Sequence, residues 1–225
     1  MNEEAEYGLS IGDVMSALLM IIILVMMNAL STLREESEKA NQFDAKRKEL
    51  YQALYKEFET DFEALYMTVD TINGVIQFNS PSVLFDLGKS QVKSEFKDIL
   101  NEFYPRYMSI LLKPEYKPYI HEVRVEGHTS SDWYENKAPN PQRDYLKNLE
   151  LSQFRSFSVL YHLLQISQDK TEKDWFQDKA VAIGYSSSKL IYDPATGAED
   201  PEKSRRVSFR AMLDYEQFMV GLESP

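Results

Sequence analysis

The chain has 225 residues, a formal net charge of −11 and no cysteine. The acidic balance provides no basic surface for nucleic acid, and the lack of cysteine excludes disulfides, cysteine-ligated metals and thiol catalysis. The three histidines are too scattered to favour a zinc site. No nucleophile and base pair, phosphate loop or metal-ligand cluster is recognisable. We therefore expect neither an enzyme nor a bound cofactor, and no direct nucleic-acid partner.

A long apolar segment near the N-terminus, residues 10–33, organises the sequence. Its last twenty residues, from Val14 to Leu33, contain no charge. As a helix they would be about 30 Å long, which matches the hydrocarbon core of a bilayer. The segment is too long for a secretory signal and lacks a basic leader. It predicts a single transmembrane helix after a short tail, residues 1–9. Asn28 lies within the span, where a hydrogen bond to a neighbouring helix is its favoured role.

Asp13 lies at the start of this segment, and Ser16 follows on the same side of the helix. Two interpretations remain open. Asp13 could complete a capping box in which Ser10 is the N-cap residue. Alternatively, Asp13 could carry an ion, because a charge at membrane depth is costly and usually faces a partner or an ion path. A helix that starts near Tyr7 or Leu9 would favour the second interpretation.

The charges that flank the apolar segment bear on its topology. The first 13 residues contain no Lys or Arg, whereas residues 34–48 contain five. By the positive-inside rule, this bias would keep the C-terminal part of the chain in the cytoplasm. Glu35, Glu36 and Glu38 are interleaved with the basic residues and weaken the bias.

Residues 34–73 are predicted to connect the membrane span to the following domain. Apolar residues recur at steps of three, four and seven from Phe43 to Ile72. This spacing predicts one amphipathic helix, continuous or nearly so with the transmembrane helix. Its apolar stripe could pack on the following domain or pair with a second copy of the chain. Asn73 and Gly74 are expected to end the helix.

Residues 74–214 are expected to form one α+β sandwich domain, followed by a C-terminal tail at residues 215–225. Strands are predicted from short apolar or alternating runs, with the last strand at an edge of the sheet. The predicted strands are residues 75–78, 83–85, 121–127, 180–183 and 206–213. The predicted helices are residues 91–112 and 149–166, and the predicted loops or charged connectors are residues 129–143, 169–178 and 186–204.

Several segments of this domain carry motifs of a known family. They are Val123–Thr129 (VRVEGHT), Asn148–Arg155 (NLELSQFR), and Gly184-Tyr185 followed after a loop by Ser204–Phe209 (SRRVSF). These segments resemble the GHTD strand, the NxxLSxxRAxxV helix and the GYG…NRRVEF ending of OmpA-like peptidoglycan-binding domains. Val83–Phe85 also matches the opening hairpin of that family. The motifs occur in the family's order, and the resemblance implies an OmpA-like α/β sandwich.

The N-terminal segment Ile11–Leu19 (IGDVMSALL) resembles the acid-bearing membrane segment of MotB-type stator subunits. With its short N-terminus and compact domain, the whole chain is similar to the ZorB-like subunits of Zorya anti-phage systems. The resemblance implies a motor driven by H⁺ or Na⁺. A homodimer would lie inside a pentameric ring of MotA- or ZorA-like multi-pass subunits and bind peptidoglycan. It also implies a location in the bacterial inner membrane, with a cytoplasmic N-terminus and a periplasmic domain. For the topology, we give this resemblance more weight than the opposite prediction of the positive-inside rule.

The resemblance also implies which residues bind peptidoglycan. In the family, the Asp of GHTD and the Arg of LSxxR hold the diaminopimelate of a peptide stem, whose zwitterionic end needs an anion and a bidentate cation. Arg155 takes the place of the cation, and Asn148 and Leu151 fill the preceding helix positions. Ser130 stands where the family has Asp, and Asp132 could substitute for it. This departure bears directly on whether diaminopimelate is the ligand.

Other residues keep more than one interpretation. Asp13 and Ser16 would bind the transported ion in a motor, whereas Asp13 would only cap the helix in a passive OmpA-like envelope tether. Arg205 and Arg206 could contact the glycan or the peptide, or one of them could pair with an acid beside the last strand. His128 is expected to be structural. A flagellar-type stator remains an alternative to the defence motor.

Overall fold

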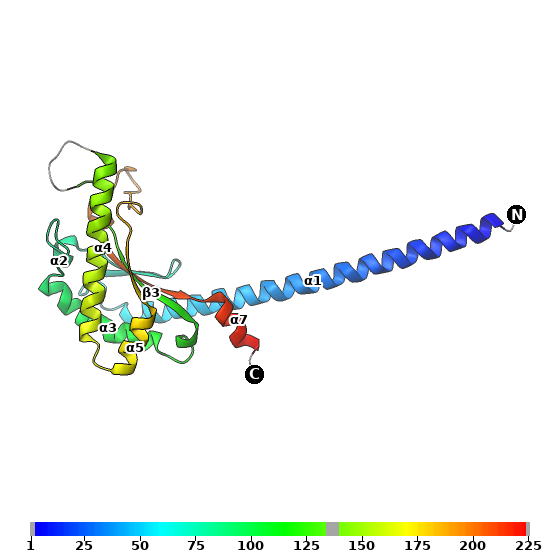
Figure 1. The fold of residues 1–225 in the computed structure, drawn as a ribbon, viewed down its shortest axis with the longest axis horizontal. Helices are drawn as coiled ribbons and strands as arrows, with labels where there is room; N and C mark the ends of the chain where they lie inside the picture. The colour runs from blue at the N-terminus through cyan, green and yellow to red at the C-terminus, as the bar shows by residue number, and fades with distance from the viewer. Residues whose placement is uncertain (1–2, 134–139, 224–225) are drawn as a thin grey trace. The chain divides into compact units, whose positions relative to one another are not determined.

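The computed structural model describes residues 3–133 and 140–223, and its ribbon is drawn in Figure 1. The chain divides into two compact units, which meet in sequence between Ala45 and Lys46. The first unit contains most of the long N-terminal helix. The second contains the end of that helix and the whole mixed α/β domain.

Helix α1 extends from Glu3 to Phe58. It is the one helix of the described residues that is long and apolar enough to cross a membrane, with a mean hydropathy of 2.4 over its most apolar 18 residues. The large apolar side chains between Ile11 and Leu33 are exposed in the isolated chain, as expected of a helix surrounded by lipid. Because α1 begins at Glu3, Ser10 does not lie at its N-terminus, and the capping-box interpretation of Asp13 is wrong.

The second unit is built on one five-stranded sheet with the order β1-β2-β5-β3-β4. Its strands are β1 (Met67–Asp70), β2 (Val75–Phe78), β3 (Ile120–Gly127), β4 (Ala180–Gly184) and β5 (Val207–Leu213). Strands β3 and β4 pair in parallel, and all other neighbours are antiparallel. The parallel pair needs a crossover connection, which the chain between β3 and β4 supplies.

The longer helices of this unit are packed on the sheet and on one another (Figure 1). The helices are α2 (Pro81–Leu84), α3 (Ser94–Leu111), the 3₁₀ turn η1 (Lys117–Tyr119), α4 (Pro141–Ile166), α5 (Lys170–Lys179), α6 (Pro201–Ser204) and α7 (Tyr215–Glu223). Helix α4 packs on β3 and β4, α5 packs on β3, and α3 lies beside α4. These contacts give the two-layer α/β arrangement that the sequence predicts.

Aromatic rings form the centre of the core. Phe103 on α3 lies 5.1 Å from Phe78 on β2 and 5.0 Å from Phe209 on β5, measured between ring centroids. Phe58, in the last turn of α1, lies 5.2 Å from Phe103 and is fully buried. The end of α1 therefore belongs to the core of the domain, and large rings in edge and tilted geometries stabilise that core.

Two glycines allow α4 to approach the sheet closely. Gly127 and Gly184 are paired across β3 and β4. A Cβ atom on Gly127 would lie 2.2 Å from the carbonyl oxygen of Ser152, and one on Gly184 would lie 2.5 Å from the backbone nitrogen of Gln153. Only glycine therefore fits at either position, because any side chain would push α4 off the strands.

The predicted connector helix is wrong beyond Phe58. The chain turns after that residue, and β1 then occupies Met67–Asp70. The apolar spacing continued through this region because Leu65 is buried in the same core and Val69 packs against it. Neither residue is helical, since Leu65 lies in the turn and Val69 in β1, which pairs with β2 as an antiparallel hairpin. The 34–73 interval therefore contains the end of a helix, a turn and a strand.

Three further predictions of secondary structure are wrong. Val83 and Leu84 of the expected strand at 83–85 belong to the short helix α2, which Pro81 favours at its first position, and Phe85 forms only an isolated bridge with Val92. The expected connector at 169–178 is mostly helix α5, whose N-cap Asp169 accepts a hydrogen bond from the Glu172 amide at 2.8 Å. The expected tail at 215–225 contains helix α7.

The place of the last strand also differs from expectation. Strand β5 lies between β2 and β3 rather than at an edge, and the edges are β1 and β4. The other predicted strands, at 75–78, 121–127 and 180–183, are confirmed. The helix predicted at 149–166 is also confirmed but begins earlier, at Pro141.

We expect Gly127→Ala to lower the free energy of unfolding by about 1–3 kcal/mol, because the added methyl group would meet the backbone of α4. Urea unfolding of the full chain in detergent, followed by tryptophan fluorescence, measures the change. Gly12→Ala is the control, since a Cβ atom there has nothing within 4 Å. An unchanged midpoint for Gly127→Ala would show that the close approach is not required.

Candidate functional site

Arg155 is held in the middle of α4 by contacts with the segment that follows α2. Its Nε atom donates to the carbonyl oxygen of Lys89 at 2.9 Å, and Nη2 donates to that of Asp86 at 3.4 Å. The guanidinium group also lies 4.7 Å from the centroid of the Phe85 ring. Hydrogen bonds and a cation–π contact therefore fix its orientation.

The charge of Arg155 is buried without a carboxylate partner among the residues that the structure describes. Its exposed fraction is 8%. Burial, and then repulsion from Arg205, lower the pKa of Arg155 to about 10. The group stays protonated at neutral pH, so it leaves a positive charge that only neutral carbonyl oxygens and a ring compensate.

Arg155 lines a cavity of about 230 Å³. Other lining residues come from α2, the end of β3 and the region around α6, and include Leu84, Phe85, His128, Glu202, Arg205 and Arg206. The cavity combines apolar walls with three guanidinium groups and one carboxylate. Such a composition suits a small ligand that carries a carboxylate group and a second polar or cationic group.

His128 forms the wall of the cavity at the end of β3. Its ring stacks on Tyr185 with centroids 5.2 Å apart and planes 6° apart, and only 4% of the residue is exposed. Nε2 lies 3.6 Å from a carboxylate oxygen of Glu126. Burial lowers the pKa of His128, so the ring is neutral at pH 7. These contacts agree with the structural role expected for this residue.

Glu126 and Arg210 complete the charged group beneath His128. Nε of Arg210, on β5, lies 3.3 Å from a Glu126 carboxylate oxygen. Burial raises the pKa of Glu126, but the neighbouring His128 and Arg210 outweigh it and hold that pKa below its usual value. The pair keeps a buried carboxylate ionised within the sheet.

Arg206 is also buried beside the cavity. Nη1 donates to the carbonyl oxygen of Ser204 at 3.2 Å and Nη2 to that of Lys189 at 3.1 Å. Burial lowers the pKa of Arg206. Like Arg155, this residue therefore uses carbonyl oxygens to hold a guanidinium group at the cavity wall. The structure brings these two predicted site residues together.

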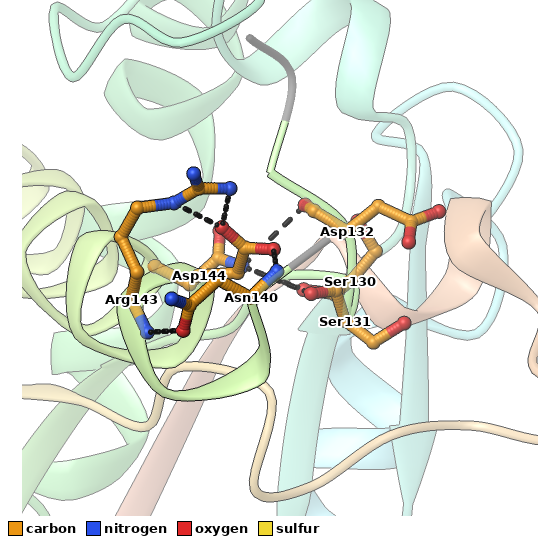
Figure 2. A network of polar contacts seen from close by, with 7 residues as sticks. Ser130, Ser131, Asp132, Asn140, Arg143 and Asp144 are labelled. Atoms are coloured by element: carbon orange, nitrogen blue, oxygen red, sulfur yellow. Dashed lines mark hydrogen bonds and ion pairs between the residues drawn. The ribbon is translucent and has the colours of Figure 1, made fainter. Parts of the chain in front are cut away.

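Asn148, Ser130 and Asp132 form a second group at the loop after β3, where Figure 2 labels Ser130 and Asp132. Asn148 is buried, and its Nδ2 atom donates to the carbonyl oxygens of Ser130, Ser131 and Asp132 at 3.2–3.4 Å. The amide of Asn148 therefore holds the loop backbone. Neither Ser130 nor Asp132 lines the Arg155 cavity, and Leu151 is half-buried on α4.

The start of α4 is capped by residues of its own first turn (Figure 2). Asn140 is the N-cap residue and accepts a hydrogen bond from the Arg143 amide at 3.0 Å, while Asp144 accepts one from the Asn140 amide at 3.2 Å. This reciprocal pattern caps the helix, which begins at Pro141, seven residues before Asn148. The predicted loop at 129–143 lies partly outside the described residues, which do not include 134–139.

Sequence reasoning missed two acidic residues near these groups. Glu202 lines the Arg155 cavity. Glu199 accepts hydrogen bonds from the backbone nitrogen and the hydroxyl group of Ser131, the former at 3.0 Å. Both glutamates lie in the expected loop at 186–204. That loop contains several acidic residues, and no periodic pattern in the sequence distinguishes these two from the others. Among the described residues, no cluster of acidic and histidine side chains could hold a metal ion.

Comparison with known proteins connects this geometry to a family. No family model matches the chain. The curated Zorya protein ZorB of Escherichia coli strain ATCC 8739 is 36% identical to it over 219 residues, which cover 96% of this chain and 91% of the relative. The chain belongs to the ZorB family. A second ZorB, from E. coli O139:H28, is 25% identical and is covered to 82% of its length.

A solved structure supports the fold of the second unit. A MotB-like protein from Desulfovibrio vulgaris matches with a TM-score of 0.51 and 20% identity, over 78% of this chain and 99% of that chain. At this identity the match shows the fold alone. The expected α/β fold is therefore confirmed, and the curated relatives confirm the resemblance to ZorB.

We expect His128 to make folding stability depend on pH. Because its pKa is lowered from 6.5 on folding, the unfolded chain binds the proton more readily. The stability that depends on the neutral ring is fully present above pH 6.5 and is lost as the pH falls toward the folded pKa. Between about pH 7.5 and pH 5.5, the melting temperature should fall more in the wild type than in His128→Phe.

The variant His128→Phe can keep the stack on Tyr185 without a titratable group. His162 also has a lowered pKa, but it is present in both proteins and its contribution cancels in the comparison. Equal falls in melting temperature for the two proteins would contradict the assignment to His128.

Proposed function

We propose that this chain is the peptidoglycan-anchored membrane subunit of an ion-driven, MotB-type motor that acts in anti-phage defence. It would lie in the bacterial inner membrane as a single-pass homodimer, with a cytoplasmic N-terminus and a periplasmic domain. A ring of MotA- or ZorA-like multi-pass subunits, five in our proposal, would surround the two membrane helices. The chain itself would catalyse no covalent reaction and hold no cofactor.

The position of Asp13 carries the motor part of the proposal. The residue lies ten positions after the start of α1, so its carboxylate does not serve the orphan amide groups of the helix end. Its side chain is exposed on the helix surface next to long apolar residues. A carboxylate at membrane depth needs a protein partner or an ion. Ser16, one turn later, would add a hydroxyl group to an H⁺ or Na⁺ path.

The Arg155 cavity carries the anchoring part. A peptide stem of peptidoglycan presents carboxylates, and a diamino acid end also presents an ammonium group. Arg155 and Arg206 would receive the carboxylate, because both guanidinium groups line the cavity. Glu202 would supply the anion for the ammonium group in place of the aspartate that Ser130 replaces. Asn148 would act by fixing the loop after β3 rather than by contacting the ligand.

Two rival functions share parts of this assignment. A passive envelope tether would need the cavity but not Asp13. A flagellar-type stator would need both, in a different cellular context. The similarity to curated Zorya proteins over nearly the whole chain favours the defence motor.

We expect Asp13→Asn to abolish protection against phage while the membrane complex still assembles, because the amide cannot take up and release a cation. Plaque counts measure protection, and co-purification of a multi-pass partner in a fixed ratio measures assembly. Asp13→Glu is the control that keeps the carboxylate and should retain part of the activity. Full protection by Asp13→Asn would refute the ion-carrier role and favour the tether.

We expect Arg155→Ala to weaken binding of the full chain to isolated peptidoglycan sacculi by about 30-fold or more, because a charged contact is lost. Arg155→Lys keeps the charge but loses the bidentate geometry, so its affinity for sacculi should lie between those of the wild type and Arg155→Ala. Lys147→Ala is the control, since Lys147 lies on the same helix with a side chain that is 53% exposed. Equal binding by all four proteins would exclude the cavity as the anchor site.

A further inference from the structure

Three aromatic side chains on the outer surface of α4 have no role in the assignments above. Phe154, Phe157 and Tyr161 are 53%, 55% and 57% exposed. Their spacing of three, four and seven residues puts them on one side of the helix. The rings of Phe157 and Tyr161 stack with centroids 6.2 Å apart. Contiguous exposed aromatic residues on a soluble domain mark a contact surface.

Phe157 and Tyr161 border a groove of about 430 Å³. The other lining residues are mostly uncharged and polar, and include Ser90, Gln91, Ser158, His162 and Gln165, with Lys97 as the cationic member. The groove is in the size range of small-molecule sites, about 300–1,000 Å³. It combines flat aromatic faces with amide and hydroxyl groups, and contains no carboxylate.

A short segment separates this groove from the Arg155 cavity. The carbonyl oxygens of Asp86 and Lys89 hold Arg155 on one side. Ser90 and Gln91, which follow directly, line the groove on the other side. An antiparallel bridge between Phe85 and Val92 closes the base of this segment.

Arg155 and Phe157 lie two residues apart on α4, so their side chains leave different sides of that helix. The link between the two sites is therefore the 86–91 segment, in which Leu87 lines the cavity and Ser90 and Gln91 line the groove.

We propose that this groove binds the glycan strand of peptidoglycan, with sugar rings stacked on Phe157 and Tyr161. The apolar faces of pyranose rings carry C–H groups with a positive edge, which the negative faces of aromatic rings attract. Hydroxyl and N-acetyl groups at the rim of the sugars match the amides of Gln91 and Gln165 and the hydroxyl of Ser158. A neutral polymer of this kind suits a groove without carboxylates.

The arrangement of peptidoglycan itself supports a composite site. Peptide stems branch from the glycan strand, so a protein that holds a stem in a cavity meets the strand a short distance away. The inference rests on the proposed function, because it takes the cavity as the site of the stem. It adds a second ligand class, an amino-sugar polysaccharide, at residues to which no role has been assigned.

The test compares three probes with the full chain purified in detergent: intact sacculi, a neutral β-1,4-linked N-acetylglucosamine oligomer as the bare glycan, and a soluble diaminopimelate-containing stem tripeptide. The double variant Phe157→Ala/Tyr161→Ala should bind the bare glycan about three- to tenfold more weakly for each ring removed, from the usual strength of aromatic contacts. Its affinity for the tripeptide should be unchanged. Arg155→Ala should show the opposite pattern.

Tyr145→Ala is the matched control, because Tyr145 is a 41% exposed aromatic residue of α4 that does not line the groove. It should bind all three probes like the wild type. Phe157 and Tyr161 are more than half exposed, so the melting temperature of the double variant should change little.

Each other outcome has a distinct meaning. If the double variant binds bare glycan like the wild type while Arg155→Ala loses the tripeptide, the glycan groove is wrong and the proposed anchor function stands. If the wild type binds bare glycan but not the tripeptide, the groove stands and the stem cavity is wrong. If it binds no probe, both are wrong. If the double variant changes only the oligomeric state in sedimentation, a second copy covers the face and the inference is overturned.

Discussion

The arrangement of the domain depends on backbone contact between α4 and the parallel pair β3 and β4. Gly127 and Gly184 face Ser152 and Gln153 at distances that no side chain would allow. Hydrogen bonds reinforce the contact: the Gln153 side chain accepts from the Gly184 amide at 2.9 Å, and Ser152 accepts from the Ser186 amide at 3.0 Å. The position of Arg155 at the cavity wall follows from this contact.

Burial of charge determines what the cavity can accept. Arg155 and Arg206 both use carbonyl oxygens as partners, and burial lowers the pKa of each. A buried guanidinium group that has only neutral partners retains capacity for an anion. The neighbouring His128 stays neutral because it too is buried, so it does not add to the positive charge. The cavity therefore favours a carboxylate, and Glu202 gives it one acidic group for an amine.

The N-terminal helix presents a different physical problem. Its apolar surface from Ile11 to Leu33 is exposed in the isolated chain and suits lipid. Asp13 is the exception within that surface, since a carboxylate has no favourable partner in hydrocarbon. The helix starts at Glu3, so the aspartate lies within regular helix rather than at its end. A partner subunit or a transported cation, as in the proposed function, would resolve this conflict.

Local sequence determined the elements whose signal is contained in their own residues. The uncharged run from Val14 to Leu33 predicted the membrane helix, and alternation predicted β3 and β5. The order of motifs identified the domain and pointed to Arg155 and Arg206, which the structure places at one cavity. These features depend on composition and period along the chain.

Only the tertiary structure decided which elements meet. The apolar spacing through Leu65 and Val69 continued as in a helix, but pairing with β2 made Met67–Asp70 a strand. Strand β5 became central because it pairs with β2 on one side and β3 on the other. The alternation of apolar residues along a strand does not determine which strands lie beside it. The two pockets also depend on tertiary structure, because segments far apart in sequence meet at each of them. Glu202 and Phe85 meet Arg155 at the cavity, and Ser90 meets Phe157 at the groove. Sequence patterns record which face of an element is buried, whereas the neighbours of that face are fixed only when the whole core packs.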